Sequence, residues 1–279
     1  MLVDIQNTPD AREVELEQVG VRDLRYPISV MDRDNERQDT VAQLSLSVTL
    51  PHHFKGTHMS RFIEILHANR GQFTMKTLPS ILESLRKRLD APSARIEVSF
   101  PYFMSRVAPA SGMSALLDYQ CCFIAESCAD KFEFTMKVEV PVTSLCPCSK
   151  AISDYGAHNQ RGYVTIELRP ERDSAGQPAM IWIEEVVEVA ESSASAPIYP
   201  LLKRIDERHV TMQAYDNPAF VEDIVRNVAV KLRQDNRVAS FVVEAVNQES
   251  IHNHSAYARS SWVRSPSPQQ SKREELVGV

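Results

Sequence analysis

Residues 131–150 read KFEFTMKVEVPVTSLCPCSK, a regular stretch that runs into a pair of cysteines. Every second side chain of its first half is apolar: Phe132, Phe134, Met136, Val138 and Val140. Because successive side chains of a strand point to opposite faces of a sheet, this alternation predicts a strand with one buried face and one wet face. Burial on one side is typical of an antiparallel sheet.

The spacing of apolar residues also predicts strands and helices before and after this strand. Further strands are expected at 43–50, 94–100, 115–126, 162–168, 179–187, 238–246 and 254–262, and helices at 59–70, 77–89, 198–205 and 218–232. Strands, a helical pair and more strands thus occur twice, which indicates an α+β protein with an antiparallel sheet and helices on one face in each repeat. We expect one catalytic domain over residues 21–264, made of modules at about 21–142 and 143–264, with a mobile arm at 1–20 and a disordered tail at 265–279.

Composition narrows the class of protein. The chain has 279 residues and a net charge of −6, which argues against a general nucleic-acid binder but leaves room for a small anionic substrate. No apolar run approaches the roughly 20 residues of a membrane helix, and the first residues do not form a secretory signal. Five cysteines, an odd number, favour a reducing compartment, so we expect a cytoplasmic protein that is not bound to membranes.

The sharpest chemical signal follows the strand end. Cys146 and Cys148 flank a proline, and His158 follows twelve residues after Cys146 in Gly-Ala-His-Asn-Gln-Arg. A thiolate and an imidazole suit Zn²⁺ or a similar divalent ion, and a catalytic metal site needs only about three protein ligands plus an open position. Cys148 is the weaker thiol candidate.

A second cluster, Glu249-Ser-Ile-His252-Asn-His254, precedes the last expected strand. If the cluster enters that strand, the two histidines lie on one face and point into one pocket. Taken alone, they could equally be surface histidines near a strand start. With Cys146 and His158 available, a role as metal ligands or as acid–base groups is favoured.

Two charged segments are open to more than one interpretation. Glu191 and the run Leu202–Glu207 contain carboxylates beside Lys203 and Arg204, which are commonly solvated salt bridges but could hold a base and phosphates. Lys55-Gly-Thr precedes an expected helix and could bind an anion, although Thr57 or Ser60 as a simple helix cap competes with that interpretation.

Six stretches together resemble the prokaryotic type IB GTP cyclohydrolases: VGVRDLRYPI, KGTHMSRF, TSLCPCSKAISDYGAHNQRG, LLKRIDERHVT, AYDNPAFVEDIV and ESIHNHSAYA. The resemblance implies tandem modules of the tunnelling fold in a homotetramer, with active sites at subunit interfaces. It implies the substrate GTP, the products formate and 7,8-dihydroneopterin triphosphate, and a place at the first step of folate biosynthesis. It also implies a divalent metal cofactor, Mn²⁺ or Zn²⁺.

The resemblance also assigns roles residue by residue. Cys146, His158 and His252 match catalytic and metal-binding positions, Glu191 becomes a carboxylate ligand, and His254 competes with His252 for the metal. Glu207 matches the glutamate that anchors guanine, and the triphosphate would meet cations drawn from Lys55, Arg61, Lys150, Arg161, Lys203 and Arg204. Met212 stands where some relatives have an acidic residue and receives no role.

Two rival functions remain at this stage. Another tunnelling-fold enzyme, such as a nitrile reductase, would use Cys146 or Cys148 as a nucleophile with a nicotinamide cofactor. A non-catalytic protein would close Cys146, Cys148 and the histidines around a structural metal. The His-x-His pair favours metal chemistry over the reductase.

Overall fold

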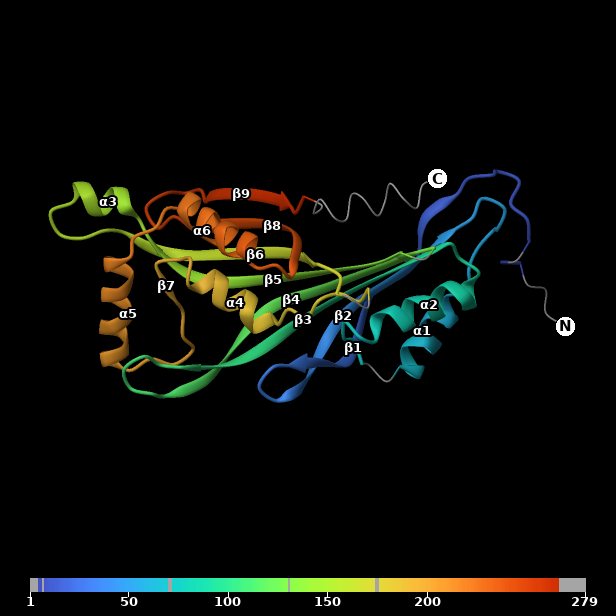
Figure 1. Cartoon of the computed structure of the whole chain (residues 1–279), viewed down its shortest axis with the longest axis horizontal. Coiled ribbons are helices and arrows are strands. Elements are labelled where there is room, and N and C mark those ends of the chain that lie inside the picture. The colour runs from blue at the N-terminus through green and yellow to red at the C-terminus, as the bar shows by residue number, and fades with distance from the viewer. Residues whose placement is uncertain (1–4, 7, 70–71, 130, 174–175, 266–279) are drawn as a thin grey trace.

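The computed structural model describes residues 5–6, 8–69, 72–129, 131–173 and 176–265. Within these residues, nine strands form a single sheet that carries six helices (Figure 1). The elements in chain order are β1 Leu16–Asp32, β2 Glu36–Leu50, α1 Met59–Ala68, α2 Leu78–Leu89, β3 Ser93–Val107, β4 Ser114–Cys128, β5 Lys131–Leu145, α3 Pro147–Ile152, β6 Asn159–Pro170, α4 Ile183–Glu191, β7 Ala196–Pro197, α5 Arg204–Asp216, α6 Val221–Gln234, β8 Val238–Asn247 and β9 Ala256–Val263.

All pairings in the sheet are antiparallel, and the strand order is β1-β2-β3-β4-β5-β6-β8-β9, with the short β7 paired to β5. The expected antiparallel sheet is therefore confirmed. Its central strand is β5, whose alternate residues Phe134, Met136, Val138 and Val140 are all buried, as the pattern of this segment predicts. The first half has the order ββααββ, and the second half has the strands β5, β6, β8 and β9 around α5 and α6, with α3, α4 and β7 added between them. The module boundary expected near residue 142 falls inside β5.

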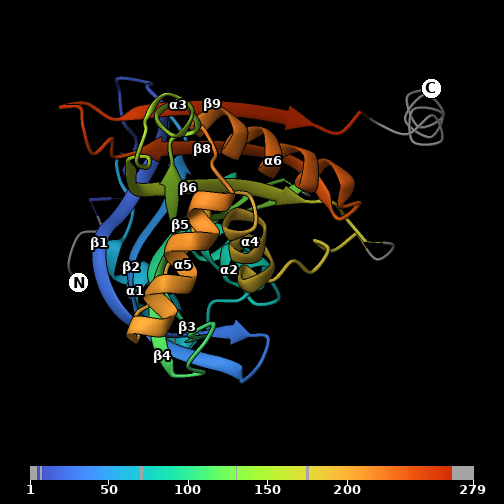
Figure 2. The ribbon, with the colours of Figure 1, turned by 90° about the vertical axis from the view of Figure 1, so that its left-hand side faces the viewer.

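Helices cover one face of the sheet (Figure 2). The apolar stripe of α2, made of Leu78, Ile81, Leu82, Leu85 and Leu89, packs on β2, β3 and β4 and is buried throughout. Burial of each such side chain stabilises the fold by about 1.5–3 kcal/mol. In the second half, α6 packs on β8 and β9, and α4 packs on β5 and β6. None of the described helices is long and apolar enough to cross a membrane.

Two segments differ from the sequence-based expectation. Residues 179–187 were expected to form a strand, but α4 begins at Ile183, where the Trp182 amide donates to Glu185 Oε2 at 2.9 Å and caps the first turn. Residues 198–205 were expected to form a helix, but the chain stays irregular up to Arg204, since Pro200 disfavours helical geometry at Tyr199. The helix there, α5, starts later and extends to Asp216.

The predicted N-terminal arm is shorter than expected, because β1 already begins at Leu16. Further upstream, backbone bonds connect residues 6, 8 and 10 with residues 53–56, including Lys55 N to the Thr8 carbonyl at 3.1 Å. The predicted disordered tail lies outside the described residues beyond Ser265.

Three buried carboxylates of the second half bind groups of the first half. Glu184 Oε1 accepts from the Tyr102 hydroxyl at 2.7 Å and from the Arg33 amide at 2.9 Å. Glu191 pairs with Arg106. Asp206 accepts from the amides of Ala110 and Ser111, at 2.8 and 2.7 Å. These contacts fix α4 and α5 against the hairpins β1–β2 and β3–β4.

Candidate active site

One cavity of about 600 Å³ brings together four of the predicted site residues, Cys146, His158, His252 and His254. It lies where β5 and β8 end and β6 and β9 begin, beside α3 and the start of α6, at the end of the sheet opposite α1 and α2 (Figure 1). Its lining includes the side chains of Cys146, Cys148, His158, His252, His254, Glu222 and Glu249. The three segments that carry these residues, 146–158, the start of α6 and 249–254, are far apart in the sequence, and the sheet brings them together.

Cys146 is placed by the start of α3. It is the residue before the helix, Pro147 occupies the first helical position, and Cys146 Sγ accepts from the Ser149 amide at 3.4 Å. Cys146 N donates to the His158 carbonyl at 3.1 Å, and Ser149 Oγ accepts from the His158 amide at 3.1 Å. The thiol and the imidazole are thus held by one compact loop, as their spacing predicts.

His158 is the more enclosed of the cavity histidines, with its side chain 14% exposed. Its Nδ1 lies 2.8 Å from Gln160 Oε1 and 3.8 Å from Glu249 Oε2. The described residues offer no hydrogen-bond partner to the other ring nitrogen, Nε2. The ring therefore has one nitrogen engaged with the protein and one available for a ligand.

His252 and His254 stand on the exposed rim of the cavity. Their rings are stacked with centroids 5.0 Å apart and an interplanar angle of 18°. They were expected to share one face of a strand, but β9 begins only at Ala256, so both lie in the loop before it and line the cavity from there.

The donor set of the cavity suits a divalent metal. A thiol, neutral imidazoles and a carboxylate are the usual ligands of Zn²⁺, and two of these types also bind Mn²⁺. Among the described residues, no three such side chains already converge at metal-binding distances. The fit therefore rests on the chemistry of the donors and on the free nitrogen of His158.

Glu191 does not line this cavity. It lies at the end of α4, 8% exposed, where it pairs with Arg106 and accepts from the Tyr119 hydroxyl at 3.0 Å. Burial raises the pKa of the Glu191 carboxyl, although Arg106 and Tyr119 partly offset this effect. In a single chain, this carboxylate already has partners.

The predicted substrate-binding residues are dispersed. Lys203, Arg204 and Glu207 are exposed around the first turn of α5, outside the cavity lining. Lys55 is exposed in the β2–α1 loop, at the end of the molecule that carries α1 and α2 (Figure 1). Within one chain, the structure therefore brings Cys146, His158, His252 and His254 together, but not Glu191, Glu207, Lys55, Lys203 or Arg204.

Sequence reasoning missed several residues of the cavity. Glu249 belongs to the quoted histidine cluster and Glu222 lies at the start of α6, yet neither received a role. Ser144, Gln160 and Asn247, which are 0%, 8% and 2% exposed, also line the cavity. The sequence did contain one signal for these three residues: each is a polar residue at a position where the alternation of its strand predicts a buried apolar side chain.

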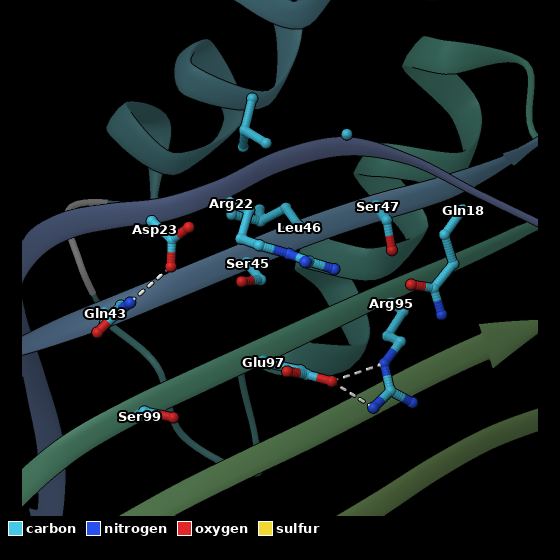
Figure 3. A pocket seen from close by; sticks show the side chains of 12 residues that line it. Gln18, Arg22, Asp23, Gln43, Ser45, Leu46, Ser47, Arg95, Glu97 and Ser99 are labelled. Carbon is cyan, nitrogen blue, oxygen red and sulfur yellow. Dashed lines mark hydrogen bonds and ion pairs between the residues drawn. The ribbon is translucent and has the colours of Figure 1, made fainter.

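A second cavity of about 530 Å³ lies over β1, β2 and β3 (Figure 3). Its polar groups are partly paired with one another: Gln43 Nε2 donates to Asp23 Oδ1 at 2.6 Å, and Arg95 Nε donates to Glu97 Oε1 at 3.0 Å. Its lining contains neither cysteine nor histidine, so it lacks the donors of the cavity around Cys146.

Comparison with known families gives a match over nearly the whole chain. The family model described as "Type I GTP cyclohydrolase folE2" matches residues 2–258. The GTP cyclohydrolase FolE2 of Nitrosococcus oceani is 52% identical over 255 residues, which cover 91% of this chain and 93% of that protein. The protein of the same name from Nitrosomonas eutropha is 51% identical over 258 residues, or 92% of this chain and 94% of that protein.

Solved structures share the fold at low sequence identity. Urate oxidase from Bacillus sp. TB-90 aligns with a TM-score of 0.51 and 9% identity, over 90% of this chain and 100% of that chain. Urate oxidase from Bacillus subtilis 168 aligns with a TM-score of 0.50 and 9% identity, over 89% and 99%. The sheet with helices on one face is thus the tunnelling fold, as the resemblance implied.

Proposed function

Because this chain belongs to the type I GTP cyclohydrolase folE2 family, we propose that it converts GTP and water into formate and 7,8-dihydroneopterin triphosphate, the first step of folate biosynthesis. The observation that carries this proposal is the cavity that joins Cys146, His158, His252 and His254. The reaction needs a nucleophile for an unreactive purine carbon and a proton donor for a ring nitrogen, and this set of side chains can support both.

The proposed cofactor is Mn²⁺ or Zn²⁺, held by Cys146 and His158 with His252 or His254. When bound, such a cation supplies hydroxide near neutral pH, because it lowers the pKa of water from 15.7 to about 7. The exposed rim position of His252 and His254 lets these side chains adjust toward the Cys146 loop without disturbing the core.

Histidines of the cavity are proposed to move the protons. Imidazole changes its charge in the physiological range, so a histidine can protonate the ring nitrogen that leaves carbon 8 and then receive a proton from water. His252 suits this role when His254 binds the cation. His158 is held by its neighbours and suits ligation better than proton shuttling.

Guanine recognition calls for a carboxylate that accepts from the donor edge of the base. The resemblance assigns this role to Glu207, whereas Glu222 is a carboxylate that lines the cavity in the same chain. Bound substrate would shield this carboxylate from water, so a base that cannot donate hydrogen bonds to it would leave it unpaired at a free-energy cost, and this cost supplies selectivity for guanine.

The distribution of the residues supports an assembly of subunits. The β2–α1 loop, which carries Lys55, and the α3 region, which lines the cavity, lie at opposite ends of the sheet (Figure 1). A triphosphate in the cavity would therefore meet Lys55 only on a neighbouring copy. We infer a homotetramer with active sites at subunit interfaces, in which Glu207, Lys203 and Arg204 add to the cavity.

The decisive experiment incubates the purified protein with GTP and Mn²⁺ or Zn²⁺ and follows formate release and pterin fluorescence after oxidation. We expect metal-dependent formation of both products, and loss of both in Cys146→Ala. A folded protein that gives no product with any divalent metal would refute the proposal. Consumption of NADPH would instead favour the reductase function.

A further inference from the structure

A buried chain of hydrogen bonds leads from the start of α6 to the ring of His158. Its first member, Ser144, is 0% exposed and donates its hydroxyl proton to the Ala219 carbonyl at 3.1 Å. Asn247 Nδ2 lies 2.9 Å from Ser144 Oγ, and Gln160 Nε2 lies 3.5 Å from Ser144 Oγ. A carbonyl oxygen only accepts, so the hydroxyl of Ser144 uses its single proton in the hydrogen bond to Ala219. Ser144 Oγ can therefore only accept from the two side-chain amides.

This commitment orients the side-chain amide of Gln160. Gln160 Nε2 faces Ser144 Oγ and also lies 3.5 Å from Glu249 Oε1, a carboxylate oxygen that accepts. The amide oxygen must therefore point the other way, toward His158, where Oε1 lies 2.8 Å from Nδ1. Two independent acceptors thus agree on the same orientation.

The orientation of Gln160 determines which nitrogen of His158 carries the proton. An amide oxygen has no proton to give, so Nδ1 must be the donor of this hydrogen bond. A neutral His158 then has its lone pair on Nε2, the nitrogen without a partner among the described residues. A metal ion requires a ring nitrogen in this state.

We propose that Gln160 is a positioning residue, which fixes the Nδ1–H tautomer of His158 and presents Nε2 as a metal donor. The proposal rests on the metal-dependent function proposed above. The competing explanation is that Gln160 only satisfies buried polar groups at the junction of β5 and β6. Under that explanation, its loss would destabilise the fold but would leave metal binding by the folded protein unchanged.

The tautomer can be read directly in the metal-free protein, independently of turnover. Nitrogen NMR of ¹⁵N-histidine-labelled protein, with the signal assigned by comparison with His158→Asn, should show His158 protonated at Nδ1. In Gln160→Met, which keeps the volume but removes the acceptor, a substantial population protonated at Nε2 should appear. Protonation at Nε2 in the wild-type ring would overturn the proposal.

Metal affinity supplies the second readout. Competition with a chromophoric chelator should show that Gln160→Met binds Zn²⁺ about 10- to 100-fold more weakly than the wild type. Gln160→Glu retains an acceptor for Nδ1–H and should bind more tightly than Gln160→Met. Wild-type affinity in Gln160→Met, or equal affinities of the two variants, would overturn the proposal.

The matched control is Thr135→Val, which removes a partly buried hydrogen bond of β5 away from the cavity, the one that Thr135 Oγ1 accepts from Arg169 Nε at 3.2 Å. This variant should bind Zn²⁺ as the wild type does. Excess Zn²⁺ should restore turnover in Gln160→Met, since the loss lies in metal occupancy. If the wild type neither binds metal nor turns over GTP, the proposed function fails, while the tautomer measurement still decides the role of Gln160.

Discussion

Asp206 shows how one side chain can hold a loop and a helix together. Its carboxylate accepts from Ser111 Oγ at 2.6 Å and from the Lys203 amide at 2.8 Å, besides the two amides of the β3–β4 loop. Burial would raise its pKa, but these hydrogen bonds outweigh burial and hold the pKa well below its usual value. A carboxyl with a lowered pKa stabilises the native state above the ordinary pKa and loses that contribution as the pH falls through the folded value.

Substitution of Asp206 by Asn should therefore act mainly above the ordinary aspartate pKa of 3.8. We expect a lower melting temperature than the wild type at pH 7, with a difference that shrinks as the pH falls below 4. Thermal unfolding followed by circular dichroism between pH 7 and pH 3 measures this difference. A difference that stays constant over the whole range would show that charge is not the cause.

Single substitutions can also show which of two carboxylates, Glu222 or Glu207, binds guanine. Both side chains are exposed in the single chain: Glu222 lines the cavity, and Glu207 lies on α5 outside it. If a carboxylate pairs with guanine, its replacement by Gln should reduce kcat/KM for GTP by about 10²-fold or more, since an unmatched buried polar group costs several kcal/mol. Steady-state kinetics of Glu222→Gln and Glu207→Gln assigns the role, with retained Zn²⁺ binding as the control for an intact site.

Residue types and residue partners were predictable from the sequence to different degrees. Cys146, His158, His252 and His254 stand out because thiols and imidazoles have few other uses at loop positions. The role of Gln160 depends on the register that pairs Ser144 with Gln160, and the place of Asn247 depends on its pairing with Gly162. Such pairings between strands are long-range facts that no local pattern contains.

At the scale of elements, the alternation of apolar and polar residues predicted the strands well, but short apolar runs did not distinguish a strand from a helix. Segment 179–187 is apolar at its centre, and its helical stripe of Ile183, Val186, Val187 and Ala190 becomes clear only when residues beyond 187 are included. Similarly, α5 buries only Asp206 and Ala214, so it has almost no apolar periodicity to detect.

The pairing of β1 with β2 depends on a close approach at Gly20. A Cβ at this position would lie 1.9 Å from the Leu46 carbonyl oxygen and 2.7 Å from Ser47 Cα, both backbone atoms. Gly20→Ala should force the strands apart and lower the free energy of unfolding by about 1–3 kcal/mol, with faster amide exchange in β1 and β2. Denaturant unfolding and hydrogen exchange measure both effects.

Gly56→Ala is the matched control for this substitution. Its added Cβ would meet only the side chain and Cα of Gln6, at 3.5 Å and beyond, so stability should change little. Equal losses in the two variants would refute the steric explanation for Gly20.

At the scale of the whole molecule, the distance between the Lys55 loop and the cavity leads to a complementation experiment. If each site takes Cys146 from one subunit and Lys55 from its neighbour, Cys146→Ala and Lys55→Met should both be inactive alone, but mixed oligomers should regain activity. Random mixing in equal amounts gives about a quarter of the sites with both native residues. If oligomers shown to contain both variants regain no activity, Cys146 and Lys55 of neighbouring subunits do not act in the same site.

The carboxylates that connect the two halves have a consequence for a chain cut between β4 and β5. Each fragment would keep its own strands and helices, but Glu184, Glu191 and Asp206 would lose their donors on the other fragment. Association with any other chain would leave these carboxylates unpaired, which is unfavourable. Association of the two fragments restores the β4–β5 strand pairing from Gln120–Glu139 to Cys128–Lys131. The two fragments are therefore expected to recombine selectively, which would turn pterin fluorescence into a reporter of their encounter.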